Sequence, residues 1–139
     1  SRSCFRGTRE AFSYDQIAKK LVRELVAADL IEETLKLPAA LLYLLPWALA
    51  HSEDLEDLDY ALELIDKAAA SSPSFSLFSD RNRRAVEQHR QVLEKFGRYP
   101  HRNKQLGRNN TPEEKAWLED TENLPVWAGG NLSIEENIT

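Results

Sequence analysis

The sequence predicts an all-α fold, and three observations support this class. Apolar residues recur at intervals of three or four positions, which is the spacing of one face of an α-helix. Several segments begin or end with residues typical of helix termini, and no segment alternates apolar and polar residues as a half-buried strand does. We assign residues 1–128 to a single helical domain and residues 129–139 to a flexible C-terminal tail.

The first predicted helix covers residues 14–29, and Ser13 with Gln16 has the form of a capping box at its start. Six apolar residues recur at helical spacing and are expected to face the core: Ile17, Ala18, Leu21, Val22, Leu25 and Val26. The charged residues between them are expected to be solvated on the other side of the helix: Lys19, Lys20, Arg23 and Glu24. The helix is therefore predicted to be amphipathic, with one buried face.

The second predicted helix, residues 38–50, is apolar nearly all round, which is typical of a central, buried element. Pro46 is expected to kink or end it. Ser52 is the expected cap of a third helix that continues to Ala68 and is followed by a linker-like segment at residues 70–74. These elements are predicted to form the middle of the domain.

The fourth predicted helix begins near Asp80 and ends at Gly97, where glycine suits the left-handed position that closes many helices. Its inner face is predicted to contain Ala85, Val86, His89, Val92, Leu93 and Phe96. The run from Thr111 to Glu114 combines a cap, a first-turn proline and a returning glutamate, so a last helix is predicted to begin there.

Composition excludes several classes of protein. No apolar run reaches the roughly 18 residues that span a bilayer, and the single cysteine, Cys4, excludes an internal disulfide and a multi-cysteine zinc site. We expect an intracellular, cytoplasmic protein with no cofactor, no nucleic-acid partner and no membrane partner. Its oligomeric state is not predicted by the sequence.

The charge distribution is uneven. Residues 81–108 contain nine Lys or Arg and two Asp or Glu, a net charge of +7, although the chain as a whole carries −5. Residues 53–66 contain seven carboxylates and no cation. An anionic partner is one interpretation of the basic segment. We prefer the alternative, in which the acidic helix lies against the basic one inside the same fold.

Three stretches carry a family resemblance. They are Phe5 to Thr8 with Ala11, Phe12 and Asp15; the central His51-Ser52-Glu53; and FGRYPHRN, residues 96–103, followed by Leu106-Gly107-Arg108 and the Thr111 to Glu114 run. In these stretches the sequence resembles the uncharacterised family called domain of unknown function 924. The resemblance implies a compact array of antiparallel helical hairpins, similar to tetratricopeptide proteins, and it implies no reaction.

The sequence departs from the family pattern in two places. Family members have further N-terminal helices that end in a Leu-Asp-Gln-Phe-Pro-Arg-like stretch, of which only Arg2 is matched here, so we expect those helices to be missing. The family also tends to have a proline three residues before the central histidine. Here Ala48 occupies that position and Pro46 lies five residues before His51, which leaves the local helix geometry open.

The polar residues of these motifs allow several interpretations. A metal site at His51, Glu53, His89 and His101 is not favoured, because no pair has helical metal-ligand spacing, and we predict no metal. An acid–base site at His51 and Glu53 would need partners from other segments. No catalytic residue is assigned. Anion binding suits the guanidinium groups better. The candidate ligand-binding residues are Arg6, His51, Glu53, Arg98, His101, Arg102, Asn103 and Arg108.

The same residues have a purely structural interpretation, which we prefer. Gly97 lets the chain turn, and Arg98, His101, Arg102 and Asn103 then tie the turn to the first loop and to the His51 corner. The leading hypothesis is therefore a non-enzymatic interaction domain with a protein or peptide partner. The alternatives are a small-molecule or anion site, including a hydrolytic one, and a subunit of a larger assembly.

Overall fold

The computed structural model describes residues 4–5 and 7–131, and the chain forms two compact units. Unit 1, Ser1–Arg98, contains η1 (Arg9–Phe12), α1 (Asp15–Ala27), α2 (Ile31–Thr34), α3 (Ala39–Leu42), α4 (Leu44–Ala50), α5 (Leu55–Ser71) and α6 (Pro73–Phe96). Unit 2, Tyr99–Thr139, contains η2 (Pro100–Arg102), α7 (Asn103–Leu106), α8 (Pro112–Glu119) and η3 (Val126–Ala128). Every regular element of the described residues is helical, which confirms the all-α class. The assignment of residues 1–128 to a single domain stays a prediction.

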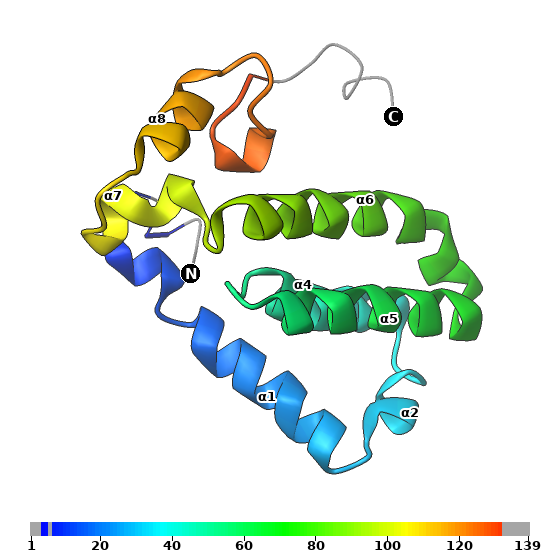
Figure 1. The fold of residues 1–139 in the computed structure, drawn as a ribbon. Helices are drawn as coiled ribbons and strands as arrows, with labels where there is room; N and C mark the ends of the chain where they lie inside the picture. The colour runs from blue at the N-terminus through cyan, green and yellow to red at the C-terminus, as the bar shows by residue number, and fades with distance from the viewer. Residues whose placement is uncertain (1–3, 6, 132–139) are drawn as a thin grey trace. The chain divides into compact units, whose positions relative to one another are not determined.

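The core of unit 1 lies between α4, α5 and α6, which pack side by side (Figure 1). These helices contribute the most completely buried apolar side chains, because each presents a face with helical periodicity to the other two. The buried residues are Leu49 and Ala50 of α4, Leu58, Ala61, Leu64, Ile65 and Ala68 of α5, and Phe75, Val86, Val92 and Leu93 of α6.

The second predicted helix is two helices in the structure. The chain breaks at Tyr43, between α3 and α4, within one turn before Pro46, so the expected kink is present, whereas the helix does not end at Pro46 itself. Pro46 is buried in the first turn of α4, where a residue needs no intrahelical hydrogen bond from its nitrogen. The expected all-round burial is also wrong, since Leu41, Tyr43 and Leu44 are 48%, 43% and 60% exposed.

Two predicted helix starts are displaced. Asp54, not Ser52, caps α5, and its side chain accepts a hydrogen bond from the backbone nitrogen of Glu56. The segment at residues 70–74 is not a linker. Ser72 caps α6 by accepting a hydrogen bond from the Phe75 nitrogen, and Pro73 occupies the first helical position, so α6 begins seven residues before Asp80.

The first helix forms as predicted, but its surroundings differ from the prediction. Tyr14 is its cap without a side-chain hydrogen bond, so the Ser13–Gln16 capping box is absent from α1. Val22 is the buried apolar residue of α1, whereas Ile17 and Leu21 are both 56% exposed. The predicted apolar face is therefore covered on one side and exposed on the other.

Two predicted helix termini are confirmed. Gly97 closes α6 with φ +68°, a left-handed conformation that glycine adopts without strain. Thr111 and Glu114 form the predicted capping box of α8.

His89 is buried in α6, as predicted for the inner face of that helix. In the described part of the chain, no helix combines the length and the apolar character needed to cross a membrane.

Candidate functional site

Two histidines and a tryptophan lie together in unit 1. His51 follows α4, which carries Trp47, and His89 lies on the inner face of α6. The centroid of the Trp47 ring is 5.7 Å from that of His51 and 6.0 Å from that of His89, and the two imidazole centroids are 6.4 Å apart. Nδ1 of His89 donates a hydrogen bond to the carbonyl oxygen of Ala85 at 2.7 Å, since a carbonyl oxygen can only accept. The interpretation of His89 as a hydrogen-bonded core residue is confirmed.

The corner that follows α6 folds around Tyr99, which is fully buried in unit 2. The guanidinium carbon of Arg102 lies 4.4 Å from the centroid of the Tyr99 ring, and Nη2 of Arg108 donates a hydrogen bond to the Tyr99 carbonyl oxygen at 3.2 Å. The His101 ring centroid lies 5.7 Å from that of Tyr99 and 5.2 Å from that of Trp127. Three of the predicted site residues therefore meet at one tyrosine.

Asn103 connects this corner to the start of α8. Its Nδ2 atom donates hydrogen bonds to Oδ1 of Asn110 at 2.8 Å and to Oε2 of Glu114 at 3.2 Å. The same Glu114 oxygen accepts a hydrogen bond from the Thr111 backbone nitrogen at 2.8 Å. Asn103 is fully buried and Glu114 is 2% exposed, so the carboxylate that completes the helix cap also holds the corner. These contacts support a structural role for Asn103.

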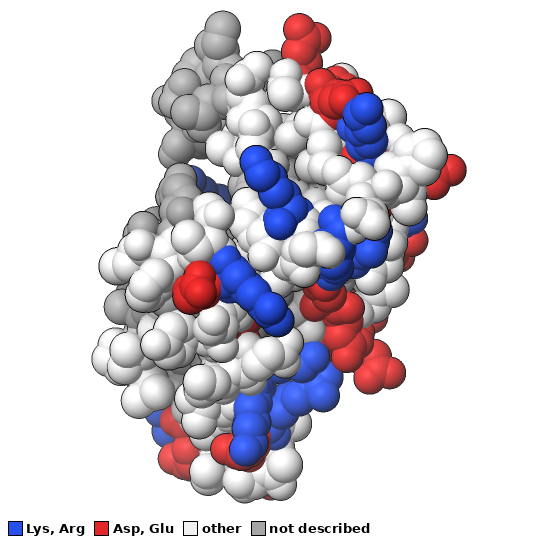
Figure 2. Space-filling model, turned by 90° about the vertical axis from the view of Figure 1, so that its left-hand side faces the viewer, with Lys and Arg blue, Asp and Glu red and all other residues white. Residues whose placement is uncertain are grey.

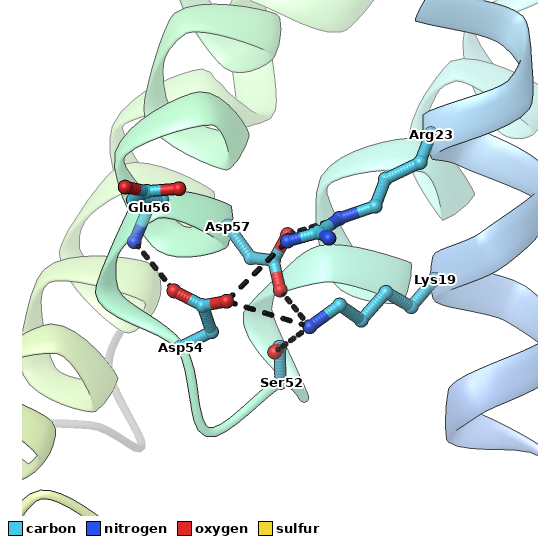
Figure 3. A network of polar contacts seen from close by, with 6 residues as sticks. All are labelled: Lys19, Arg23, Ser52, Asp54, Glu56 and Asp57. Carbon is cyan, nitrogen blue, oxygen red and sulfur yellow. Dashed lines mark hydrogen bonds and ion pairs between the residues drawn. The ribbon is translucent and has the colours of Figure 1, made fainter.

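A second polar cluster joins α1 to the turn between α4 and α5 in unit 1 (Figure 3). Lys19 forms an ion pair with the second carboxylate oxygen of Asp57, and its Nζ atom donates a hydrogen bond to Oγ of Ser52 at 3.0 Å. Arg23 donates to the first oxygen of Asp57 and, at 3.4 Å, to Asp54. The expectation that Lys19 and Arg23 are simply solvated was wrong, because their partners come from a segment more than 30 residues away.

Asp57 is the centre of this cluster, since it is only 4% exposed and bound by both cations. Burial by itself would raise the pKa of its carboxyl group. Hydrogen bonds from Lys19, Ser52 and Arg23 outweigh that effect and hold the pKa of Asp57 below its ordinary value. The cluster is thus a fixed ion-pair network at neutral pH, and it attaches a helix that has little buried apolar surface.

The acidic and basic helices of unit 1 neutralise each other, as the preferred interpretation of the charge distribution expected. Nε of Arg90 on α6 donates a hydrogen bond to Oδ1 of Asp59 on α5 at 2.6 Å, and Arg83 of α6 forms an ion pair with Asp66 of α5. In the face drawn in Figure 2, cationic and acidic side chains are interspersed with uncharged surface. Carboxylates of α5 therefore balance part of the positive charge of α6, and no external anion is needed for that part.

Comparison with known proteins identifies the family. The family model described as "Bacterial protein of unknown function (DUF924)" matches residues 1–122. The chain belongs to the DUF924 family. A search of functionally curated proteins finds no match. The chain is also similar to the solved structure of a protein of unknown function from Agrobacterium tumefaciens, with 30% sequence identity and a TM-score of 0.66. The similarity covers 86% of this chain and 60% of that one, so this chain spans about 60% of the length of that solved structure.

The predicted site residues of this DUF924 protein are divided between the two units. Unit 1 holds His51, Glu53 and Arg98, while Arg6 lies outside the described residues. Unit 2 holds the other four: His101, Arg102, Asn103 and Arg108. The structure brings these four together at Tyr99 and Glu114, two residues that sequence reasoning had not included in the site. An aromatic residue between two arginines, Arg98 and Arg102, is the signal that could have indicated Tyr99. Binding of an anion or small molecule by the candidate residues stays a prediction, as does the tie between the corner and His51.

In the part of the chain that the structure describes, no three His, Cys, Asp or Glu side chains gather closely enough to hold a metal ion. The contacts at Tyr99 and Glu114 use the guanidinium and amide groups internally. What the described geometry favours is therefore structural use of the polar motif.

Proposed function

We propose that this protein is a non-enzymatic interaction domain that binds an amphipathic helix through the outer face of α1. The observation that carries the proposal is the exposure of Tyr14, Ile17 and Leu21, which are 55%, 56% and 56% accessible to solvent. We call these three residues the apolar stripe. Their spacing of three and four positions places them on one side of the helix.

The apolar stripe has the form of a helix-binding surface. Apolar side chains at positions i, i+3 and i+7 form the ridge that packs into the groove of a second helix. Within α1 the burial of Val22 and the ion pairs of Lys19 and Arg23 already attach the helix to unit 1. The apolar stripe is not needed for that attachment, so it is accessible to a partner.

The charges beside the apolar stripe indicate the chemistry of the partner. Lys20 and Glu24 are 77% and 59% exposed and lie one turn apart, with 3.6 Å between Nζ and Oε1. A partner helix with apolar residues every three or four positions and with both an acidic and a basic flanking residue can pair with each of them. This pattern suits a mixed-charge amphipathic helix better than a strongly acidic or basic one.

The proposal includes a finer view of the architecture, in which α5 and α6 form one antiparallel hairpin of a tetratricopeptide-like array. Ser72 is the single residue between the two helices. The ion pairs between them run in opposite sequence order, since Asp59 pairs with Arg90 and Asp66 with Arg83. Both observations support a hairpin, and arrays of such hairpins commonly present a binding surface to a helix or peptide.

The experiment is a titration of the isotope-labelled protein with a synthetic amphipathic helix of about 18 residues, with leucine at i, i+3, i+4 and i+7, followed by nuclear magnetic resonance. We expect saturable shifts at the amides of the apolar stripe and of Lys20. Leu21→Asp should abolish these shifts while leaving the spectrum folded, because Leu21 is more than half exposed. The matched control is Leu77→Asp, which changes an exposed leucine of α6 instead.

Two results would overturn the proposal. The first is the absence of saturable shifts in α1 at any peptide concentration that keeps the peptide soluble. The second is equal loss of binding in Leu21→Asp and Leu77→Asp, which would indicate a general apolar effect instead of a defined surface. Self-association of the protein through α1 can be measured in the same samples without peptide. If it occurs, the partner is a second copy of this chain, and the choice of another protein as partner is wrong.

A further inference from the structure

The end of α5, Ser72 and the start of α6 form one long uncharged segment, which carries two exposed apolar residues near its C-terminal end. No charged residue occurs between Lys67 and Asp80. Phe75 of this segment is buried at 2% exposure, but Leu77 and Phe78 are 82% and 60% exposed. The end of α5 and the start of α6 lie together at one end of these two helices (Figure 1). Leu77 is the most exposed of the large apolar side chains in the described residues.

These apolar residues share a face of α6 with two arginines. At about 100° per residue, Leu77, Phe78, Arg81 and Arg84 all lie within one side of the helix. Nε of Arg84 donates a hydrogen bond to the carbonyl oxygen of Asp80 at 3.4 Å, so its guanidinium group extends back toward the N-terminal end of α6, where Leu77 lies. We call Leu77, Phe78, Arg81 and Arg84 the apolar-basic tip.

The charge at the tip is positive although the whole chain is negative. From residue 67 to residue 84 there are four Lys or Arg and one Asp, a net charge of +3 in a chain of −5. Arg83 is paired with Asp66 and Glu87. Among the described residues, none forms an ion pair with Lys67, Arg81 or Arg84, and the one acidic residue of this span is Asp80. These three cations are therefore available to an external anion.

We propose that the apolar-basic tip binds the surface of a membrane that contains anionic lipids. Side chains such as Leu77 and Phe78, which project from the end of a helix pair, can enter the boundary between head groups and acyl chains without any part of the chain spanning the bilayer. Arg81 and Arg84, about one turn further along the same face, then lie at the level of the lipid phosphates. A projecting tip suits a soft planar surface, whereas a peptide ligand is normally bound in a groove.

This inference departs from the expectation of no membrane partner, which rested on the absence of a spanning segment. That observation does not describe a small, local contact. The inference is also independent of the function proposed for α1, because the two surfaces lie on different helices and share no residue.

The test is co-sedimentation of the purified protein with vesicles of phosphatidylcholine alone and with vesicles that also contain about 30% phosphatidylserine, at low and physiological salt. We expect binding to the anionic vesicles only, and weaker binding at the higher salt concentration. Arg81→Gln and Arg84→Gln should each weaken binding about fivefold, because one cation near an anionic surface contributes on the order of that factor. The double change Leu77→Ser with Phe78→Ser should abolish binding.

The control variant is Ile17→Ser with Leu21→Ser, which removes two equally large exposed apolar residues from α1 and should bind vesicles normally. The inference is overturned if no anionic vesicle binds, or if the Leu77 and Phe78 double variant binds as well as the unmodified protein. A further result would also overturn the inference: the protein binds an oligoglutamate peptide but no vesicles, and the same variants weaken that peptide binding. The ligand of the tip would then be an acidic protein. If α1 proves not to bind a helix, these expected results for vesicle binding stay the same.

Discussion

Arg23 of α1 contacts a single carboxylate oxygen of Asp57 in α5 with two of its nitrogens, Nε at 2.9 Å and Nη2 at 2.7 Å. The other oxygen of Asp57 pairs with Lys19, so one buried carboxylate binds two cations from successive turns of the same helix (Figure 3). Since Val22 is the buried apolar residue of α1, this carboxylate is a principal attachment of that helix to unit 1.

Replacing Asp57 with alanine should lower the free energy of unfolding by about 2 to 3 kcal/mol, because Lys19, only 17% exposed, would lose its main partner. Arg23 is half exposed and can turn to solvent, which keeps the loss below that of a fully buried pair. Urea denaturation measures the difference. Asp59→Ala is the matched control, since Asp59 is 54% exposed and its pair with Arg90 should contribute less than about 1 kcal/mol. Similar losses in both variants would show that burial of the Asp57 network is not important.

The stability that Asp57 provides should depend on pH. Because the pKa of its carboxyl group is lower in the folded protein than the ordinary value of 3.8, the contribution is complete above that value. It is then lost as the pH falls below 3.8 and through the lower pKa of the folded state. Urea midpoints of the unmodified protein and of Asp57→Asn should differ by a constant amount near neutral pH and converge in acid. A difference that grows with acidity would contradict the assigned direction of the pKa.

Glu114 should be as important to unit 2 as Asp57 is to α1. Its carboxylate is 2% exposed and accepts hydrogen bonds from the Thr111 nitrogen and from the buried Asn103, so Glu114→Ala would remove the acceptor that both donors share. We expect a loss of about 2 to 3 kcal/mol, measured as faster hydrogen exchange of the α8 amides. The neighbouring Glu113→Ala, on an exposed residue of the same helical turn, should change exchange by less than about 0.5 kcal/mol. Equal acceleration by the two variants would argue against a buried cap.

The parts of the fold that sequence predicted correctly are those with local causes. Gly97 closes its helix because its own backbone adopts a positive φ, and Thr111 caps α8 through a residue three positions away. In contrast, Ser52 and Asp54 were both suitable caps, and the structure uses Asp54 for the helix while Ser52 accepts a hydrogen bond from Lys19 of another helix. A choice of this kind depends on a contact between distant segments, so no local pattern contains it.

The candidate site shows the same division. The polar corner at residues 96–103 was indicated by its composition, but the residue around which it folds is Tyr99, which sequence reasoning had not included in the site. Likewise, the partners of Lys19 and Arg23 lie 31 to 38 positions away, and helical periodicity alone placed both cations in solvent. The exposed apolar stripe and the apolar-basic tip were missed because the sequence gives the width of an apolar face but not how much of it another helix covers.

Two of the three tryptophans provide an optical label for each unit. Trp47 lies beside His51 and His89 in unit 1, and Trp127 lies beside His101 in unit 2. The emission of an indole depends on the groups around it, so the fluorescence of each tryptophan reports whether its own histidine contacts are intact. With Trp117 and Trp127 replaced by phenylalanine, Trp47 alone follows the melting of unit 1, and with Trp47 and Trp117 replaced, Trp127 alone follows that of unit 2, using reporters that the chain already contains.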